Sequence, residues 1–191
     1  MSTNLNKEMR RLLVAGAGHI MPGAGNALGR IQVYSGHANG AEGALVEVDV
    51  KTGETRVLKV IAACDVGRVM NPLALLGQVE GSISMGLGMA LQENFVMQEG
   101  KVLTDSLFKC NLPTIDQTPQ VITFFVEHET ADGPYGAKGV GELASIPTAP
   151  AIVNAIYNAT GVRCYNLPAD KKWLKAQLEA HRAEGNDPAS S

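Results

Sequence analysis

The clearest pattern in the chain is an alternation of hydrophobic and polar positions from residue 43 to residue 50. Its hydrophobic positions are Val46, Val48 and Val50. A period of two is typical of a half-buried β-strand. The turn sequence KTGE, with Gly53, follows, and TRVLKVIAAC returns as a second hydrophobic run. Residues 43–63 are therefore predicted to form a β-hairpin.

A long helix is predicted from Pro72 to about Glu93. Asn71 is a good N-cap residue and Pro72 suits the first helical position. The segment contains Gly77, Gly81, Gly86 and Gly88. Because each glycine costs about 1 kcal/mol relative to alanine inside a helix, tight packing or a ligand must compensate. Met85 and Met89 lie one turn apart and are expected to fill the core.

The second half of the chain predicts a turn at Gly100 and then a strand over 120–128. The residues from 148 to 160 predict an amphipathic helix that ends at Gly161. Its buried face is expected to carry Ile152, Ile156 and Ala159. A last helix over 167–181 is expected to begin at Pro168. Because strands and helices do not alternate regularly, the predicted fold class is α+β.

The expected organisation has three parts. Residues 1–42 form an N-terminal helix, over 5–14, and a glycine-rich connecting segment; 43–175 form the main domain; and 176–191 hold the end of the last helix and a frayed tail. The connecting segment resembles a dinucleotide-binding loop only at first sight, because Met21 stands where the third glycine of G-x-G-x-x-G is needed. A linker or a ligand-facing loop is the better interpretation.

Composition and charge narrow the class of protein. The 191 residues are 45% hydrophobic and carry a formal net charge of -3, which favours a globular protein and excludes a basic nucleic-acid-binding surface. No apolar run approaches the roughly 20 residues that cross a bilayer. The first residues lack a long apolar stretch, so no signal peptide and a cytoplasmic location are expected.

The cysteines and histidines show no metal-binding spacing. Cys64, Cys110 and Cys164 lie far apart and form no C-x-x-C pair, so no iron–sulfur or zinc site is expected from this chain alone. The stretch GPYGAKGVGE, from Gly133 to Glu142, is unusually rich in glycine and ends on a carboxylate. This stretch is either a surface loop or a backbone segment that approaches a ligand closely.

Four stretches together resemble the C-terminal part of the molybdopterin-binding subunit of the xanthine dehydrogenase/aldehyde oxidase family. They are VEVDVKTGE, DVGRVMNP, GQVEGSISMGLGMALQE and GPYGAKGVGE, and NAIYNATG followed by LP also fits. The resemblance runs from about Gly43 to Leu174. It implies the molybdopterin-binding fold of molybdenum hydroxylases. Since subunits of this family are several times longer, the chain is interpreted as a subunit from a split gene, in preference to an excised piece or a truncated remnant.

The resemblance also implies roles for individual residues. Glu142 would be the general base that takes a proton from a molybdenum-bound hydroxide, a role that partial burial of a carboxylate favours. Gln78 would hydrogen-bond the pterin, with a solvated helix face as the alternative. The other cofactor-binding candidates are Lys138, Gly139, Val140 and Gly141. Lys138 could instead hold the loop or be an ordinary surface lysine. Asp65 and Asn71 are interpreted as structural, and no protein ligand to the metal is expected.

The implied protein is a molybdopterin-dependent oxidoreductase that is active only with partner chains. The cofactor would be molybdenum-molybdopterin, with or without a cytosine dinucleotide, and iron–sulfur clusters and FAD would lie on partners. The preferred reaction is hydroxylation of an electron-poor carbon in a purine or another nitrogen heterocycle. An aldehyde substrate, or a non-catalytic remnant or assembly protein, remains as an alternative.

Overall fold

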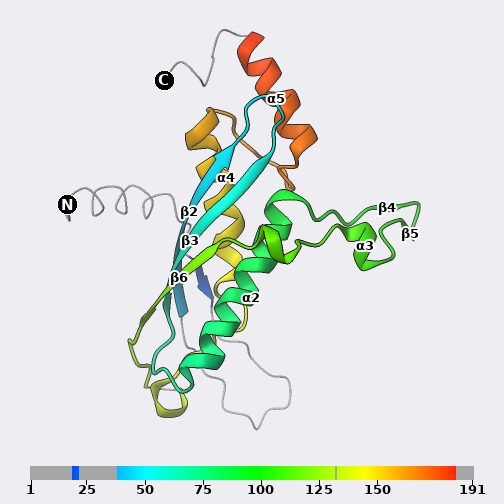
Figure 1. The fold of residues 1–191 in the computed structure, drawn as a ribbon. Helices are drawn as coiled ribbons and strands as arrows, with labels where there is room; N and C mark the ends of the chain where they lie inside the picture. Colours follow the sequence, from blue (N-terminus) through cyan, green and yellow to red (C-terminus); the bar gives the residue numbers. More distant parts are fainter. Residues whose placement is uncertain (1–18, 22–37, 132, 184–191) are drawn as a thin grey trace, which may run out of the picture.

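A four-stranded sheet forms the centre of the computed structural model, which describes residues 19–21, 38–131 and 133–183. The strands are β1 (His19–Met21), β2 (Ala38–Val48), β3 (Thr55–Asp65) and β6 (Gln120–Val126), in the order β1-β2-β3-β6. β1 with β2 and β2 with β3 pair antiparallel, whereas β3 and β6 pair parallel. The sheet therefore joins a long hairpin to a strand that arrives much later in the sequence (Figure 1).

Three helices cover this sheet and its upper end. α4 (Ser145–Thr160) packs across β2, and α2 (Pro72–Leu91) packs against α4. α5 (Lys171–Ala183) lies beside the tip of the β2–β3 hairpin (Figure 1). The side chains of Val60, Ile83 and Ile152 are completely buried in the core that results. The α+β prediction is confirmed.

The predicted hairpin is confirmed and is longer than expected. Its turn contains Gly53 at φ +74, a conformation that glycine adopts without strain. β2 begins at Ala38 instead of residue 43, because the extra residues pair with β1 on one side and β3 on the other. The predicted helix over 5–14 and most of the glycine-rich segment lie outside the described residues.

The predicted long helix is confirmed as α2. The Asn71 side chain accepts a hydrogen bond from the Ala74 N–H at 3.1 Å, as expected of an N-cap residue. The buried stripe is formed by Val79, Ile83, Leu87 and Ala90. The core prediction for Met85 and Met89 was wrong: both side chains are exposed, because they lie off this stripe.

The later elements differ from prediction mainly at their ends. α4 begins three residues before residue 148 and ends at Gly161, which has φ +75 as its predicted stop requires. Ile152 and Ile156 are buried as predicted, but Ala159 is exposed and the buried position is Thr160, four residues after Ile156. α5 begins at Lys171, after Pro168, because the Asp170 carboxylate caps its first N–H groups.

A projecting segment connects α2 to β6 (Figure 1). It contains the short strands β4 (Met97–Gln98) and β5 (Lys101–Val102), with the predicted turn at Gly100, and then the short helices α3 (Leu107–Cys110) and η1 (Ile115–Gln117). None of the helices in the described ranges is long and apolar enough to cross a membrane.

Candidate functional site

The glycine-rich stretch from 133 to 142 is attached to the end of β3. It begins with the short helix η2 (Pro134–Gly136) and leads into α4. The Lys138 N–H donates to the Val66 carbonyl at 3.0 Å, and the Arg68 N–H donates to the Gly136 carbonyl at 3.2 Å. Two segments about 70 residues apart in sequence therefore lie side by side, and this part of the stretch is held by backbone hydrogen bonds.

A buried ion pair adds to this attachment. The Lys138 ammonium lies 2.7 Å from the Asp65 carboxylate, and their side chains are only 6% and 12% exposed. Burial of Asp65 opposes its ionised form, but the bonds from Lys138 and from the Gly67 N–H outweigh it and hold the pKa of Asp65 below its usual value. Lys138 is thus not a surface lysine. Holding the loop is the role that the pair supports, and Asp65 is structural as predicted.

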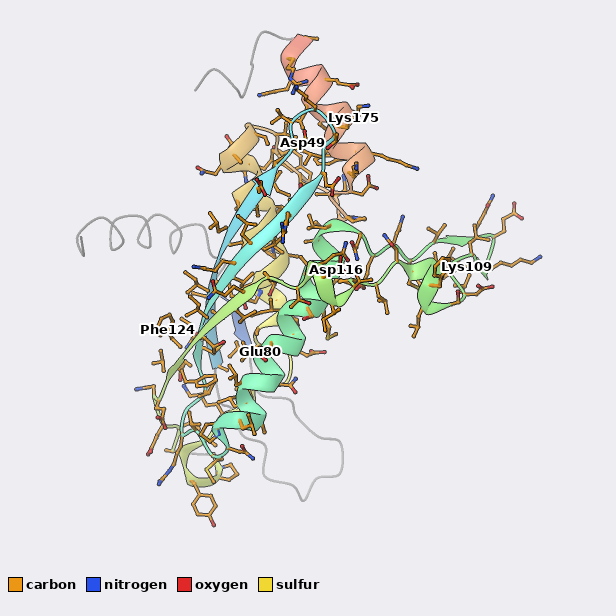
Figure 2. All side chains as sticks on the ribbon, viewed as in Figure 1. Asp49, Glu80, Lys109, Asp116, Phe124 and Lys175 are labelled. Atoms are coloured by element: carbon orange, nitrogen blue, oxygen red, sulfur yellow. The ribbon has the colours of Figure 1, made fainter. Side chains whose placement is uncertain are left out.

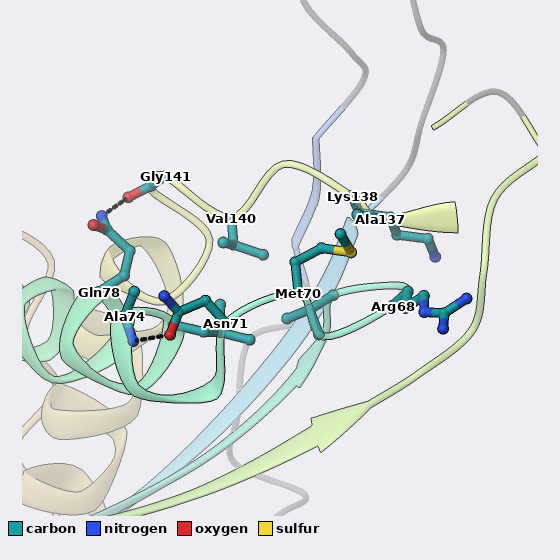
Figure 3. Close-up of a pocket in the computed structure, with 11 residues that line it drawn as sticks. Arg68, Met70, Asn71, Ala74, Gln78, Ala137, Lys138, Val140 and Gly141 are labelled. Atoms are coloured by element: carbon teal, nitrogen blue, oxygen red, sulfur yellow. Dashed lines mark hydrogen bonds between the residues drawn. The ribbon is translucent and has the colours of Figure 1, made fainter. Parts of the chain in front are cut away.

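One side-chain hydrogen bond joins α2 directly to the glycine-rich stretch. The Gln78 Nε2 donates to the Gly141 carbonyl at 2.7 Å (Figure 3). Within the described part of the chain, the Gln78 Oε1 has no hydrogen-bond partner. The bond leaves the acceptor half of the amide available, so Gln78 can both anchor the loop and accept a hydrogen bond from a ligand.

These residues surround a pocket of about 330 Å³ between the start of α2, the end of β3 and the stretch. Figure 3 shows Gln78 and Gly141 at one end of the pocket and Arg68 at the other. The lining residues are Val66, Arg68, Met70, Asn71, Ala74, Leu75, Gln78, Ala137, Lys138, Val140 and Gly141. Four predicted site residues thus line one hollow.

The pocket also contains residues that the prediction missed and lacks two that it named. Arg68 and Met70 line it, although neither was singled out. Both belong to DVGRVMNP, one of the quoted motifs, so that motif was the available signal. Gly139 and Glu142 do not line the pocket, although they flank residues that do.

The Glu142 side chain is exposed at the edge of this site. Its carbonyl accepts hydrogen bonds from the Ser145 N–H at 3.1 Å and the Ser145 hydroxyl at 2.9 Å, which places it at the entrance to α4. The partial burial that would suit a general base is not supplied by the described residues. Any such burial has to come from outside the described residues.

The glycines near the site leave space that the chain does not fill. A Cβ atom added at Gly77, Gly81, Gly139 or Gly141 would have no heavy atom within 4 Å among the neighbours considered. Gly86, further along α2, differs because a Cβ there would collide with the Thr148 side chain. Packing within the chain therefore explains Gly86 but not the four glycines near the site.

The available groups fit an organic cofactor better than a directly ligated metal ion. The site offers an amide oxygen, backbone N–H groups next to open space, and apolar side chains from Val140 and Met70. In residues 38–131 and 133–183, no group of three or more His, Cys, Asp or Glu side chains could hold a metal ion. A pterin, which carries donors and acceptors along its edge, matches this set of groups.

Comparisons with known proteins point to the same kind of ligand. The family model described as "Molybdopterin cofactor-binding domain" matches residues 11–119. An aldehyde oxidoreductase of Megalodesulfovibrio gigas is 43% identical over 136 residues, which cover 71% of this chain and 15% of the relative. A xanthine dehydrogenase molybdenum-binding subunit of Escherichia coli O157:H7 is 36% identical over 129 residues, which cover 66% of this chain and 17% of the relative.

A solved structure shows that the fold is shared as well. The aldehyde oxidoreductase from Desulfovibrio gigas superimposes with a TM-score of 0.71 and 37% identity, covering 77% of this chain and 16% of that chain. The chain thus spans less than a fifth of the length of each of these three proteins. The predicted resemblance is confirmed: the chain belongs to the molybdopterin cofactor-binding domain family, as found in the molybdenum-binding subunits of xanthine dehydrogenases and aldehyde oxidoreductases.

Proposed function

We propose that the chain supplies one wall of the molybdopterin site in a molybdenum hydroxylase assembled from several chains. The hydrogen bond from Gln78 to the Gly141 carbonyl is the main support, because it joins two predicted cofactor-binding segments that are 63 residues apart. The pocket and the unfilled space beside four glycines lie at this junction. Family membership supports a molybdenum–pterin group as the occupant.

The residues of this chain would bind and orient that group. The Gln78 Oε1 would accept a hydrogen bond from the pterin edge while its Nε2 keeps the loop in place. The backbone N–H groups of Gly139 and Gly141 would donate to oxygens of the cofactor, because no Cβ prevents close approach. Val140 lines the pocket and would exclude water from the bound face. Lys138 would act through the loop, since Asp65 already holds its ammonium.

When bound, the cofactor would supply a two-electron oxidising centre for hydroxylation of an electron-poor carbon. Glu142 would then act as the general base, accepting a proton on a carboxylate oxygen. Its exposure in this chain leaves it free to face a molecule bound over Gly139 and Gly141. Burial by that molecule and by a partner chain would favour the protonated carboxyl and so assist the transfer.

Partner chains follow from this proposal. This chain spans only 15% and 17% of the two relatives described above. The proposal assigns the other walls of the site to a second chain, which carries the remaining segments of the molybdenum-binding subunit. No C-x-x-C pair is present for iron–sulfur clusters, so electrons would leave through iron–sulfur and flavin centres on further subunits. The cofactor could be the simple pterin form or a cytosine dinucleotide.

The proposed substrate is a purine or another nitrogen heterocycle, as predicted from the sequence. An aldehyde is the second candidate, and the 43% identity to an aldehyde oxidoreductase favours it. A non-catalytic or assembly role is the third candidate, and the molybdenum content and turnover of the wild-type complex test it. Turnover of xanthine, quinoline and benzaldehyde by the purified complex distinguishes the first two.

The central test compares wild-type and Glu142→Gln complexes purified with their natural partners. The variant should retain molybdenum and lose about 10²–10⁴-fold in turnover, since an amide cannot accept the proton. Glu47→Gln, which alters an exposed carboxylate on β2, is the matched control and should behave as wild type. Near-normal turnover of a molybdenum-loaded Glu142→Gln complex would refute the assignment of the base. A wild-type complex without molybdenum or turnover would favour the non-catalytic role.

A further inference from the structure

The segment from residue 93 to residue 117, called the apolar arm below, exposes an unusual number of large hydrophobic side chains. Phe108 is 94% exposed and Ile115 is 93% exposed. Phe95, Met97, Leu103 and Leu107 are exposed as well. Single exposed hydrophobic residues are normal on protein surfaces, but a concentration of them on one segment marks an interaction site.

The arm projects away from the sheet and its helices (Figure 2, where Lys109 labels its outer part and Asp116 its base). The main contacts of β4 and β5 are with each other. The rest of the described chain therefore leaves these side chains uncovered. Burial of these side chains away from water therefore has to come from outside the described residues.

Hydrogen bonds nevertheless fix the shape of the arm. At its base, the side-chain amides of Gln92 and Gln117 bond to each other reciprocally, at 3.2 and 3.1 Å. Further out, the Leu103 N–H donates to the Val96 carbonyl at 2.8 Å, and the Val96 N–H donates to the Thr104 hydroxyl at 3.0 Å. A surface that is already ordered loses little conformational entropy when it binds, so the arm is suited to docking.

The charges on the arm do not provide a strong attraction of their own. The Lys109 ammonium lies 2.6 Å from the Asp105 carboxylate, one helical turn away, so these two charges offset each other. Aromatic and aliphatic side chains that insert into pockets commonly dominate the energy of such interfaces. Phe108 and Ile115 are the natural anchors because they are the most exposed.

We propose that the apolar arm docks onto a partner chain that carries the remaining segments of the molybdenum-binding subunit. The arm lies within residues 11–119 matched by the family model, so it is part of the shared domain and not an addition to it. In the relatives this domain is joined to a polypeptide of which the present chain covers only 15–17%. The segments that make up the rest of such a subunit are therefore the occupant to which the proposal commits. The inference rests on the proposed function.

The test uses the affinity-tagged chain, purified from its native cells as wild type, as Phe108→Ser/Ile115→Ser and as Tyr165→Ser. Tyr165 lies between α4 and α5, outside the apolar arm. It is 87% exposed and serves as the matched control. Co-purifying chains are identified by mass spectrometry, and molybdenum is measured in each preparation. Circular dichroism and thermal unfolding should be unchanged in all variants, because the substituted side chains are almost fully exposed.

The expected result is a co-purifying chain whose sequence belongs to the molybdopterin-binding subunits, retained by Tyr165→Ser and reduced at least tenfold by the arm variant. Full retention by the arm variant would overturn the docking site and leave the proposed function standing. Equal loss from Tyr165→Ser would also overturn a specific role for the arm. If the wild-type chain forms a homodimer and the arm variant is monomeric, the occupant of the arm is a second copy of this chain. A wild-type chain that binds molybdenum without any partner would overturn both proposals.

Discussion

The hydroxyl of Thr148 lies 2.6 Å from the Glu42 carboxyl oxygen Oε2 and 2.7 Å from the Ala144 carbonyl oxygen. A hydroxyl has one proton, and a carbonyl has none to give. Both short contacts are good hydrogen bonds at the same time only if the Glu42 carboxyl carries a proton. The geometry therefore favours a neutral Glu42, linking β2 to the first turn of α4 directly after Glu142.

Burial explains why this carboxyl holds its proton. Glu42 is 1% exposed, and its other oxygen, Oε1, has no hydrogen-bond partner among the residues described. Burial raises the pKa of Glu42 to about 7. The rise is opposed by the hydrogen bond that the Thr148 hydroxyl would donate to the carboxylate once Glu42 is ionised. The thiol of Cys64 is the titratable group that interacts with it, and burial together with Glu42 raises the pKa of Cys64 to about 11.

Glu42→Gln should make the chain less sensitive to pH between about 5 and 8. The stabilising contribution of Glu42 is fully present below its ordinary value of 4.5 and is lost as the pH rises through about 7. Relative to wild type, the variant should gain roughly 2–3 kcal/mol of unfolding free energy between pH 5 and pH 8. Urea unfolding at several pH values measures this. A constant difference between the two proteins would show that folding does not raise the pKa of Glu42.

Lys138→Met should destabilise the chain by about 3 kcal/mol, because it leaves the buried Asp65 carboxylate without its cation. The double variant Asp65→Asn/Lys138→Met should recover part of the loss, since no unpaired charge remains. Chemical unfolding at pH 7 measures both effects. Lys109→Met is the matched control: it breaks an exposed ion pair and should change the stability much less than Lys138→Met does. Equal losses from the two lysine variants would contradict the special role of the buried pair.

Asp65 also predicts a response to acid that is opposite in sign to that of Glu42. Its pKa is held low, so the stability that it contributes is present above about pH 4 and is lost as the pH falls further. Wild type should therefore lose stability on acidification below this pH, and Asp65→Asn should lose less of it. Unfolding measured from pH 5 to pH 2.5 tests this, and identical acid profiles for the two proteins would argue against the pair.

The sequence predicted the local elements and four of the eleven residues that line the pocket, but not the contacts that depend on distant residues. The Asn71 cap, the Gly53 turn and the Gly161 stop were predictable, because each follows from the backbone preference of one residue. The pairing of Lys138 with Asp65 joins residues 73 apart, and no local pattern encodes it. The exposure of Met85 was missed because the glycines in α2 blur the hydrophobic stripe.

The sequence alone also cannot distinguish the glycines of α2 that are needed for packing within the chain from those that face open space. Gly86→Ala should destabilise the chain by about 1–3 kcal/mol, because the new Cβ collides with Thr148. Gly77→Ala meets no neighbour in this chain and should stabilise it by up to about 1 kcal/mol through helix propensity. In the assembled complex, however, Gly77→Ala should reduce molybdenum retention. A Gly77→Ala complex with normal molybdenum content would mean that the space beside Gly77 is not needed by the cofactor.

Gln78→Ala separates the two uses of one amide. In the chain alone, loss of the 2.7 Å bond to Gly141 should leave global stability within about 0.5–1.5 kcal/mol of wild type. Backbone amides from 139 to 142 should exchange hydrogen faster, because the anchor that α2 provides is gone. In the complex, the variant should lose more molybdopterin on dialysis than wild type. Both effects would follow from one side chain that holds the loop with its nitrogen and keeps its oxygen available to a ligand.

The matched control for this last prediction is Gln177→Ala, which removes an exposed glutamine from α5. It should change neither the exchange of 139–142 nor the retention of the cofactor. Faster exchange in Gln78→Ala with normal molybdopterin retention would confine Gln78 to positioning the loop, and the pterin contact would be wrong. Unchanged exchange together with reduced retention would place its role in the cofactor contact alone. Only faster exchange together with reduced cofactor retention supports both roles of the Gln78 amide, holding the loop and binding the pterin.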